Sequence, residues 1–226
     1  MKMRVLLMLL LLQTSFMAHA IEYAGHDPQK ILTVSEQNGQ RAYGLDMRYL
    51  DRMLQDLSQR AGHYPPSFDS AEEKQRVTHD LEVLSGMLNL LLKDGKPNPQ
   101  ILFRAAMTNR MAHNLDIPGS AEKAEQQFKM LLKEEPESPQ GNYQFGVFLA
   151  ETGRAKQSIP YLEKALAMGI SEANYSLGMV YLSLGNKEEA LSRLNLYSRT
   201  YPNDGSVKQI ITAVESGQGV VKSRSP

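Results

Sequence analysis

The sequence predicts an all-α fold in which antiparallel helical hairpins stack side by side. The first observation is a pattern that recurs three times between Ala105 and Asp204. Its clearest copy places small, apolar and turn residues at fixed intervals: Leu177-Gly178-x-x-Tyr181, Gly185, Ala190, Leu194 and Pro202. The second observation is that apolar residues between the turns recur every three or four positions, which is the period of a helix that buries one face.

Two earlier copies keep this spacing, so the three copies cover residues 105–138, 139–170 and 171–204. The second copy reads Phe145-Gly146-x-x-Leu149, Gly153, Ser158, Leu162 and Ala165, and the first reads Met111-Ala112-x-x-Leu115, Gly119, Ala124, Phe128 and Pro136. The spacing is that of the tetratricopeptide pattern, and this part of the chain resembles the tetratricopeptide repeat (TPR) family. The resemblance implies a short right-handed superhelix that offers a binding surface and performs no chemistry of its own.

The first twenty residues have the features of a secretory signal peptide. Lys2 and Arg4 precede an apolar run at 5–12, and Ala18-His19-Ala20 offers small residues at the cleavage spacing. The run is shorter than the ~20 apolar residues that span a bilayer. We therefore expect cleavage after Ala20 and a mature chain without an integral membrane segment.

Composition bears on the compartment and on the class of partner. The chain has 226 residues and no cysteine, so its fold needs no disulfides, which favours a bacterial periplasm, with secretion as the second choice. Residues 1–20 hold two of the 25 basic residues and none of the 25 acidic ones, which leaves a net charge near −2. This balance does not suggest a nucleic-acid partner or an anionic membrane surface.

Residues 21–98 do not follow the repeat pattern. For 21–45 two alternatives stay open, a weakly structured arm or a small hairpin, because extended segments flank Asn38-Gly39, a dipeptide that favours a tight hairpin turn. Residues 46–98 predict a non-repeat helical hairpin, whose second helix opens with the capping box Ser70-x-x-Glu73.

Local signals also place helix ends and a terminal helix. Side chains suited to the N-cap position precede four expected helices: Ser120, Ser138, Ser171 and Asn186. Residues 205–216 predict a final helix that covers the apolar face of the third repeat, as the last unit of a repeat array requires. The tail at 217–226 has little to bury and is expected to be disordered.

No catalytic, metal-binding or cofactor motif is present in the sequence. The histidines of the mature chain stand alone, without the spacing of a zinc site: His26, His63, His79 and His113. Neither a phosphate-binding glycine loop nor a nucleophile motif occurs. We therefore expect no enzymatic activity, no cofactor and no small-molecule substrate.

The resemblance implies that residues on the first helix of each repeat line a concave peptide-binding groove. Carried over by spacing, they are Asn109, His113, Gln140, Tyr143, Val147, Glu172, Tyr175 and Met179. Only Asn109 matches the lysine, arginine and asparagine clamp with which some family members hold a C-terminal carboxylate, so that type of ligand is disfavoured. Two tyrosines, a valine and a methionine favour an apolar or aromatic segment. The alternative is that Tyr143 and Tyr175 only pack between repeats, because amphipathic rings serve both purposes.

The sequence thus predicts a periplasmic TPR adaptor or scaffold that binds a protein or peptide, in envelope assembly or secretion. A self-associating structural protein, paired through its groove or its final helix, is the alternative. The third and weaker alternative is an enzyme whose active site cannot be recognised in the sequence.

Overall fold

The structure, a computed structural model, describes residues 23–37, 40–93 and 98–217. The predicted signal peptide, the Asn38-Gly39 turn and the tail beyond Gly217 lie outside the described residues.

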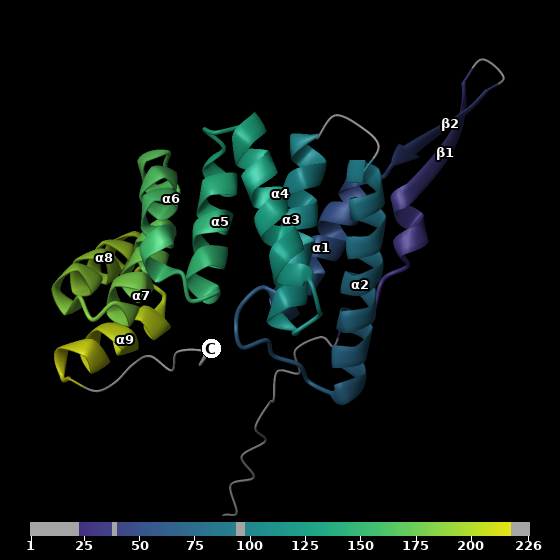
Figure 1. The fold of residues 1–226 in the computed structure, drawn as a ribbon. Coiled ribbons are helices and arrows are strands. Elements are labelled where there is room, and N and C mark those ends of the chain that lie inside the picture. Colours follow the sequence, from purple (N-terminus) through teal and green to yellow (C-terminus); the bar gives the residue numbers. More distant parts are fainter. Residues whose placement is uncertain (1–22, 38–39, 94–97, 218–226) are drawn as a thin grey trace, which may run out of the picture.

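The described chain is dominated by helices that form an elongated array (Figure 1). Three successive hairpins stand side by side, α3–α4, α5–α6 and α7–α8, which confirms the predicted fold class. The helices span Met47–Ala61 (α1), Ala71–Lys93 (α2), Pro99–Asn114 (α3), Ser120–Glu134 (α4), Pro139–Glu151 (α5), Ala155–Ala167 (α6), Ala173–Ser183 (α7), Lys187–Thr200 (α8) and Gly205–Glu215 (α9).

Glycine permits close contact between the two helices of a hairpin. A Cβ atom on Gly146 of α5 would lie 2.7 Å from Cγ of Leu162 on α6. A Cβ atom on Gly178 of α7 would lie equally close to Leu194 on α8. A larger residue at either position would push the paired helices apart, so these glycines set the spacing within the second and third hairpins.

Two of the four predicted N-caps are confirmed and two are wrong. The Ser138 hydroxyl accepts from the Gly141 N–H at 3.2 Å, and Asn186 accepts from the Glu189 N–H at 3.1 Å. Ser120 is instead the first residue of α4, and α7 begins two residues after Ser171. Gly119 and Glu172 occupy the two N-cap positions instead, and neither helix start has a side-chain cap hydrogen bond.

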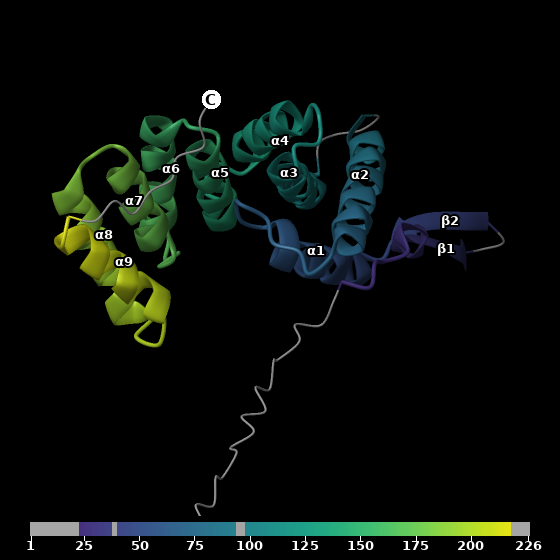
Figure 2. The same ribbon diagram turned by 90° about the horizontal axis from the view of Figure 1, so that it is seen from below.

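The N-terminal segment contains a small hairpin, which was one of the two open alternatives. A 3₁₀ turn at Pro28–Ile31 (η1) leads into β1 (Leu32–Gln37), which pairs antiparallel with β2 (Gln40–Leu45). The hairpin projects from the end of the array beside α2 (Figures 1 and 2).

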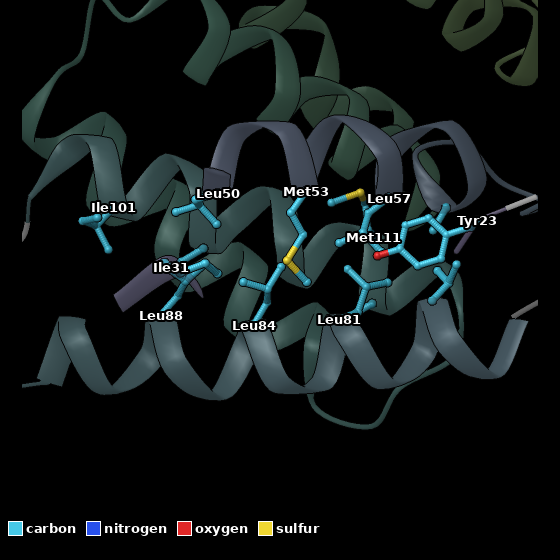
Figure 3. Packing of buried hydrophobic residues seen from close by; sticks show 14 residues of the cluster. Tyr23, Ile31, Leu50, Met53, Leu57, Leu81, Leu84, Leu88, Ile101 and Met111 are labelled. Carbon is cyan, nitrogen blue, oxygen red and sulfur yellow. The ribbon is translucent and has the colours of Figure 1, made fainter. Parts of the chain in front are cut away.

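The hairpin's base and helices α1 to α3 share one apolar core (Figure 3). Leucines of α2 face Leu50, Met53 and Leu57 of α1 across this core. Tyr23 closes one end of it, and its phenol donates to the buried carboxylate of Asp80 at 2.6 Å. Tyr23, the first residue that the structure describes, is therefore fixed to α2.

At the other end of the array, α9 covers the third hairpin. Val207 and Ile211 of α9 pack against Leu194 of α8, with Leu191 and Tyr197 at the margin of the cluster. The final helix thus lies against the apolar face that it was predicted to cover. Within the described ranges, no helix combines the length and apolarity needed to cross a membrane.

Candidate functional site

The first helices of the three hairpins form a continuous row, because α5 contacts both α3 and α7. All eight predicted groove residues lie on α3, on α5, or on α7 and the turn before it. Their exposure differs widely, and this difference decides which of them a partner can reach.

Asn109 was predicted to line the groove, and this prediction is wrong. Its side chain is fully buried. It accepts from the Ser85 hydroxyl of α2 at 2.7 Å and donates to Gln127 of α4 at 2.8 Å. The reason is that α2 packs along α3 and covers this position, where Asn109 joins a closed polar network.

Three other predicted residues are half-buried. The His113 ring lies edge-on to Phe148 of α5, with 6.2 Å between the ring centroids. Val147 packs at the margin of the cluster between the second and third hairpins. Met179 of α7 is also half-buried. These side chains offer a partner only part of their surface.

Tyr143 lies at the junction between α5 and α7. It is half-buried beside the Leu162, Leu177 and Val180 cluster, and its hydroxyl is hydrogen-bonded to the side chain of Ser176. Burial raises the pKa of Tyr143 above its usual value. The ring therefore packs between repeats and keeps part of its surface accessible.

Three further tyrosines surround the start of α7 and the end of α8. The rings of Tyr175 and Tyr197 lie 5.3 Å apart, and those of Tyr197 and Tyr201 lie 4.6 Å apart. Each of the last two hydroxyls donates to a carboxylate, Tyr197 to Asp204 at 3.1 Å and Tyr201 to Glu172. All three rings are half-buried.

We call this set of six residues the tyrosine–carboxylate surface: Tyr143, Tyr175, Tyr197, Tyr201, Glu172 and Asp204. Hydrogen bonds from Ser206 lower the pKa of Asp204, so this carboxylate is charged at neutral pH. Glu172 is exposed. The surface therefore combines ring faces with two anions, and none of its members is basic.

A buried ion pair joins the row of first helices, and the sequence prediction did not include it. Arg110 of α3 is 4% exposed and bonds Glu151 of α5 at 2.7 Å. It also donates to Gln144 at 3.0 Å and to the Gly62 carbonyl at the end of α1 at 2.9 Å. The sequence holds one signal of this ion pair. Residues 110, 144 and 176 occupy the same position in the three repeats, and all three are polar.

The outer side of the array has a separate shallow cleft of about 430 Å³ between α4, α5 and α6. Three lysines line it, but Lys129 and Lys164 are already paired with Glu125 and Glu137. In the described part of the chain, no group of three or more histidine, aspartate or glutamate side chains could hold a metal ion.

Residues 171–195, which hold α7 and the first part of α8, match the family model described as Tetratricopeptide repeat. This segment is a tetratricopeptide repeat. The family resemblance inferred from the residue spacing is therefore confirmed. No protein among the curated sequences matches this chain.

Solved structures of TPR proteins share the fold. The crystal structure of MamA superposes with a TM-score of 0.55 at 22% identity, covering 67% of this chain and 86% of that chain. TTC0263, a thermophilic TPR protein of Thermus thermophilus, gives 0.52 at 16% identity and covers 75% and 92%. YrrB, a TPR protein with an unusual peptide-binding site, gives 0.50 at 17% identity and covers 74% and 81%. At these identities the likeness shows a TPR fold.

Proposed function

We propose that this TPR protein is an exported interaction module, an adaptor or scaffold that holds a segment of a partner protein against α5 and α7. The observation that carries the proposal is the tyrosine–carboxylate surface. It places half-buried aromatic rings beside two carboxylates, and three of its members stand where the family resemblance implies a peptide groove: Tyr143, Glu172 and Tyr175. The likeness to YrrB supports a peptide as the ligand, since that TPR protein has a peptide-binding site.

The chemistry of this surface points to a segment that carries both a cation and an apolar or aromatic side chain. Ring faces attract ammonium and guanidinium groups, and nearby carboxylates strengthen that attraction. Glu172 and Asp204 supply the negative charge. An acidic segment would be repelled, and a terminal carboxylate would find no cation in this set of residues.

A binding assay with labelled peptides tests this proposal. Peptides with lysine or arginine next to an aromatic residue should bind more tightly than peptides in which the basic residue is replaced by glutamate. Added salt should weaken the binding, because partly exposed charges are screened. Glu172→Gln should weaken the binding by about 1 kcal/mol, whereas Glu134→Gln, an exposed change on α4, should have no effect. Equal binding of basic and acidic peptides would contradict the proposal.

We propose that the protein resides in the periplasm. Lys2 and Arg4, the apolar run at 5–12 and the small residues before Ile21 are the features of a secretory signal peptide. Cell fractionation and the mass of the purified protein test this part. A mature chain that begins at Ile21 in the periplasmic fraction is expected. Full-length protein in the cytoplasm would contradict export and would leave the peptide-binding proposal to be tested separately.

A further inference from the structure

The hairpin β1–β2 exposes an apolar face. In its register Val34 lies opposite Tyr43, and Leu32 lies opposite Leu45. Residues directly opposite in an antiparallel pair share one face of the ribbon. Leu45 is partly buried against the core, but Leu32 is 56%, Val34 62% and Tyr43 77% exposed. We call these three exposed side chains the hairpin patch.

The hairpin has no layer covering this face in the described chain, and it projects away from the helices (Figures 1 and 2). A lone two-stranded hairpin is only marginally stable in water. Its other face carries Thr33, Ser35 and Gly44. One polar and one apolar face are typical of a ribbon that packs on another surface.

A second apolar patch lies on α2, at the same end of the array. Leu90 is 67% and Leu91 45% exposed. One turn before Leu90 stands Gly86, where an added Cβ atom would meet nothing within 4 Å. Glycine destabilises a helix relative to alanine, and contacts within this chain give no reason for it here. We call Gly86, Leu90 and Leu91 the α2 patch.

The two patches hold most of the large apolar side chains that are exposed among the described residues. Of the eight large apolar side chains that are exposed among the described residues, five belong to the hairpin or to α2. Terminal units of repeat arrays normally present a polar outer face, since an apolar one promotes association. This end of the array therefore has the composition of an interface.

Charges favour a second copy of this chain as the occupant. On the apolar face of the hairpin, the pair next to Val34 and Tyr43 toward the tip is Glu36 opposite Arg41. The α2 patch is flanked by exposed Glu82 and Lys93. Each patch is thus bordered by one acid and one base, so two copies can match opposite charges in a symmetric arrangement.

We infer that the chain forms a two-fold dimer in which the hairpin patch of each copy covers the α2 patch of the other. Both halves of this interface are present on one molecule, as an isologous contact requires. Gly86 lets the ribbon approach the helix closely. This surface is separate from the tyrosine–carboxylate surface, so each copy in the dimer keeps its own peptide site.

Oligomeric state is the first test, with a chain that begins at Ile21 and retains every described residue. Sedimentation over a range of concentrations should show a dimer. Val34→Thr with Tyr43→Thr keeps residues suited to a strand, and Leu90→Lys with Gly86→Gln keeps the helix; each pair should shift the protein to monomer. Leu184→Lys with Leu196→Gln, which changes exposed leucines elsewhere, should leave the dimer intact. A monomer at every concentration, or a dimer indifferent to both patch variants, overturns the inference.

Because the chain contains no cysteine, cross-linking gives a second and independent readout. A Tyr43→Cys chain is mixed with a Leu90→Cys chain, so a disulfide between the two positions can form only between copies. Under oxidation this mixture should give a cross-linked dimer faster than Tyr43→Cys mixed with Leu184→Cys. Equal rates for the two mixtures overturn the inference. A Tyr43→Cys/Leu90→Cys double variant whose disulfide forms only within one chain also overturns it.

Discussion

Arg110 on α3 holds Glu151 on α5 through two hydrogen bonds, from Nε to Oε2 at 2.8 Å and from Nη2 to Oε1 at 2.7 Å. The same guanidinium donates to the carbonyl of Gly62, where α1 ends. One buried cation thus joins the non-repeat helices to the first two hairpins. It fixes how the N-terminal part of the array meets α5, which bears part of the proposed peptide site.

Replacing Arg110 by methionine should lower the free energy of unfolding by about 3–5 kcal/mol, because Glu151 is left largely buried without its cation. Urea denaturation measures the loss. Arg104→Met is a matched control, since Arg104 also links α3 to α1 but pairs with Asp51, whose side chain is 53% exposed. It should lose at most about 1 kcal/mol. Similar losses for both variants would show that Arg110 does not have this structural role.

Asn109→Leu should destabilise the protein without changing peptide affinity. The substitution removes the acceptor of the Ser85 hydroxyl and the donor to the Gln127 amide oxygen at a buried site, and each group left unsatisfied costs about 1–3 kcal/mol. Thermal melting and peptide binding are measured on the same preparation. A variant with unchanged stability and weaker binding would restore Asn109 to the groove.

The helices could be predicted from the sequence because the signals that define them are local. An N-cap side chain acts within one helical turn. The structure shows three such caps, at Asn98 before Pro99, at Ser138 before Pro139 and at Asn186. The two failed caps, Ser120 and Ser171, depend on how the preceding turn closes. Side-chain type alone does not determine that.

The candidate site was less predictable because it depends on contacts between distant segments. Asn109 is buried by a helix 24 residues earlier, at Ser85. Arg110 and Glu151 are 41 residues apart, and repeat spacing says which residues share a position without saying which of them pair. Tyr197 and Tyr201 were missed because Tyr197 lies on the second helix of its repeat and Tyr201 directly follows that helix, where the family resemblance implies packing.

Stability should fall in strong alkali. Burial and the hydrogen bond to Asp204 raise the pKa of Tyr197 from 10.0 to about 12, and burial with the Asp80 contact raises that of Tyr23. Folding thus favours the neutral phenols, so their contribution is complete below about pH 10 and is lost as the pH rises through the folded pKa. Urea midpoints between about pH 9 and about pH 12 should fall less steeply in Tyr23→Phe and Tyr197→Phe. Slopes identical to that of the parent protein would contradict this assignment.

Truncation after Pro202 should make the protein aggregate or melt at a lower temperature. The cut removes Val207 and Ile211, which cover Leu194, and a buried aliphatic side chain contributes ~1.5–3 kcal/mol. It also removes Asp204, the acceptor for Tyr197. Light scattering and calorimetry compare the truncated chain with one that ends at Gly217. A truncated chain that stays monomeric at the same melting temperature would show that α9 is not a cap.

Tyr143 and Tyr175 can be separated from one another by comparing binding with stability. Tyr175→Ala should cost ~2 kcal/mol or more of peptide binding if the ring is an anchor. Tyr143→Ala should affect stability more strongly, because that ring packs between α5 and α7 beside a buried cluster. Loss of stability in both variants with no loss of affinity in the remaining folded protein would assign both rings to packing alone.

Site-specific photo-cross-linking in living cells tests the central claim most directly. A photoreactive residue replaces Gln140 or Glu172, which are exposed on the proposed binding side, and Gln126 on α4 serves as the matched control. We expect one partner band from both binding-side positions, absent from the control and weakened by Tyr175→Ala. An equal band from Gln126, or none from Gln140 and Glu172 in protein that is folded and expressed, would contradict the claim that α5 and α7 hold the partner.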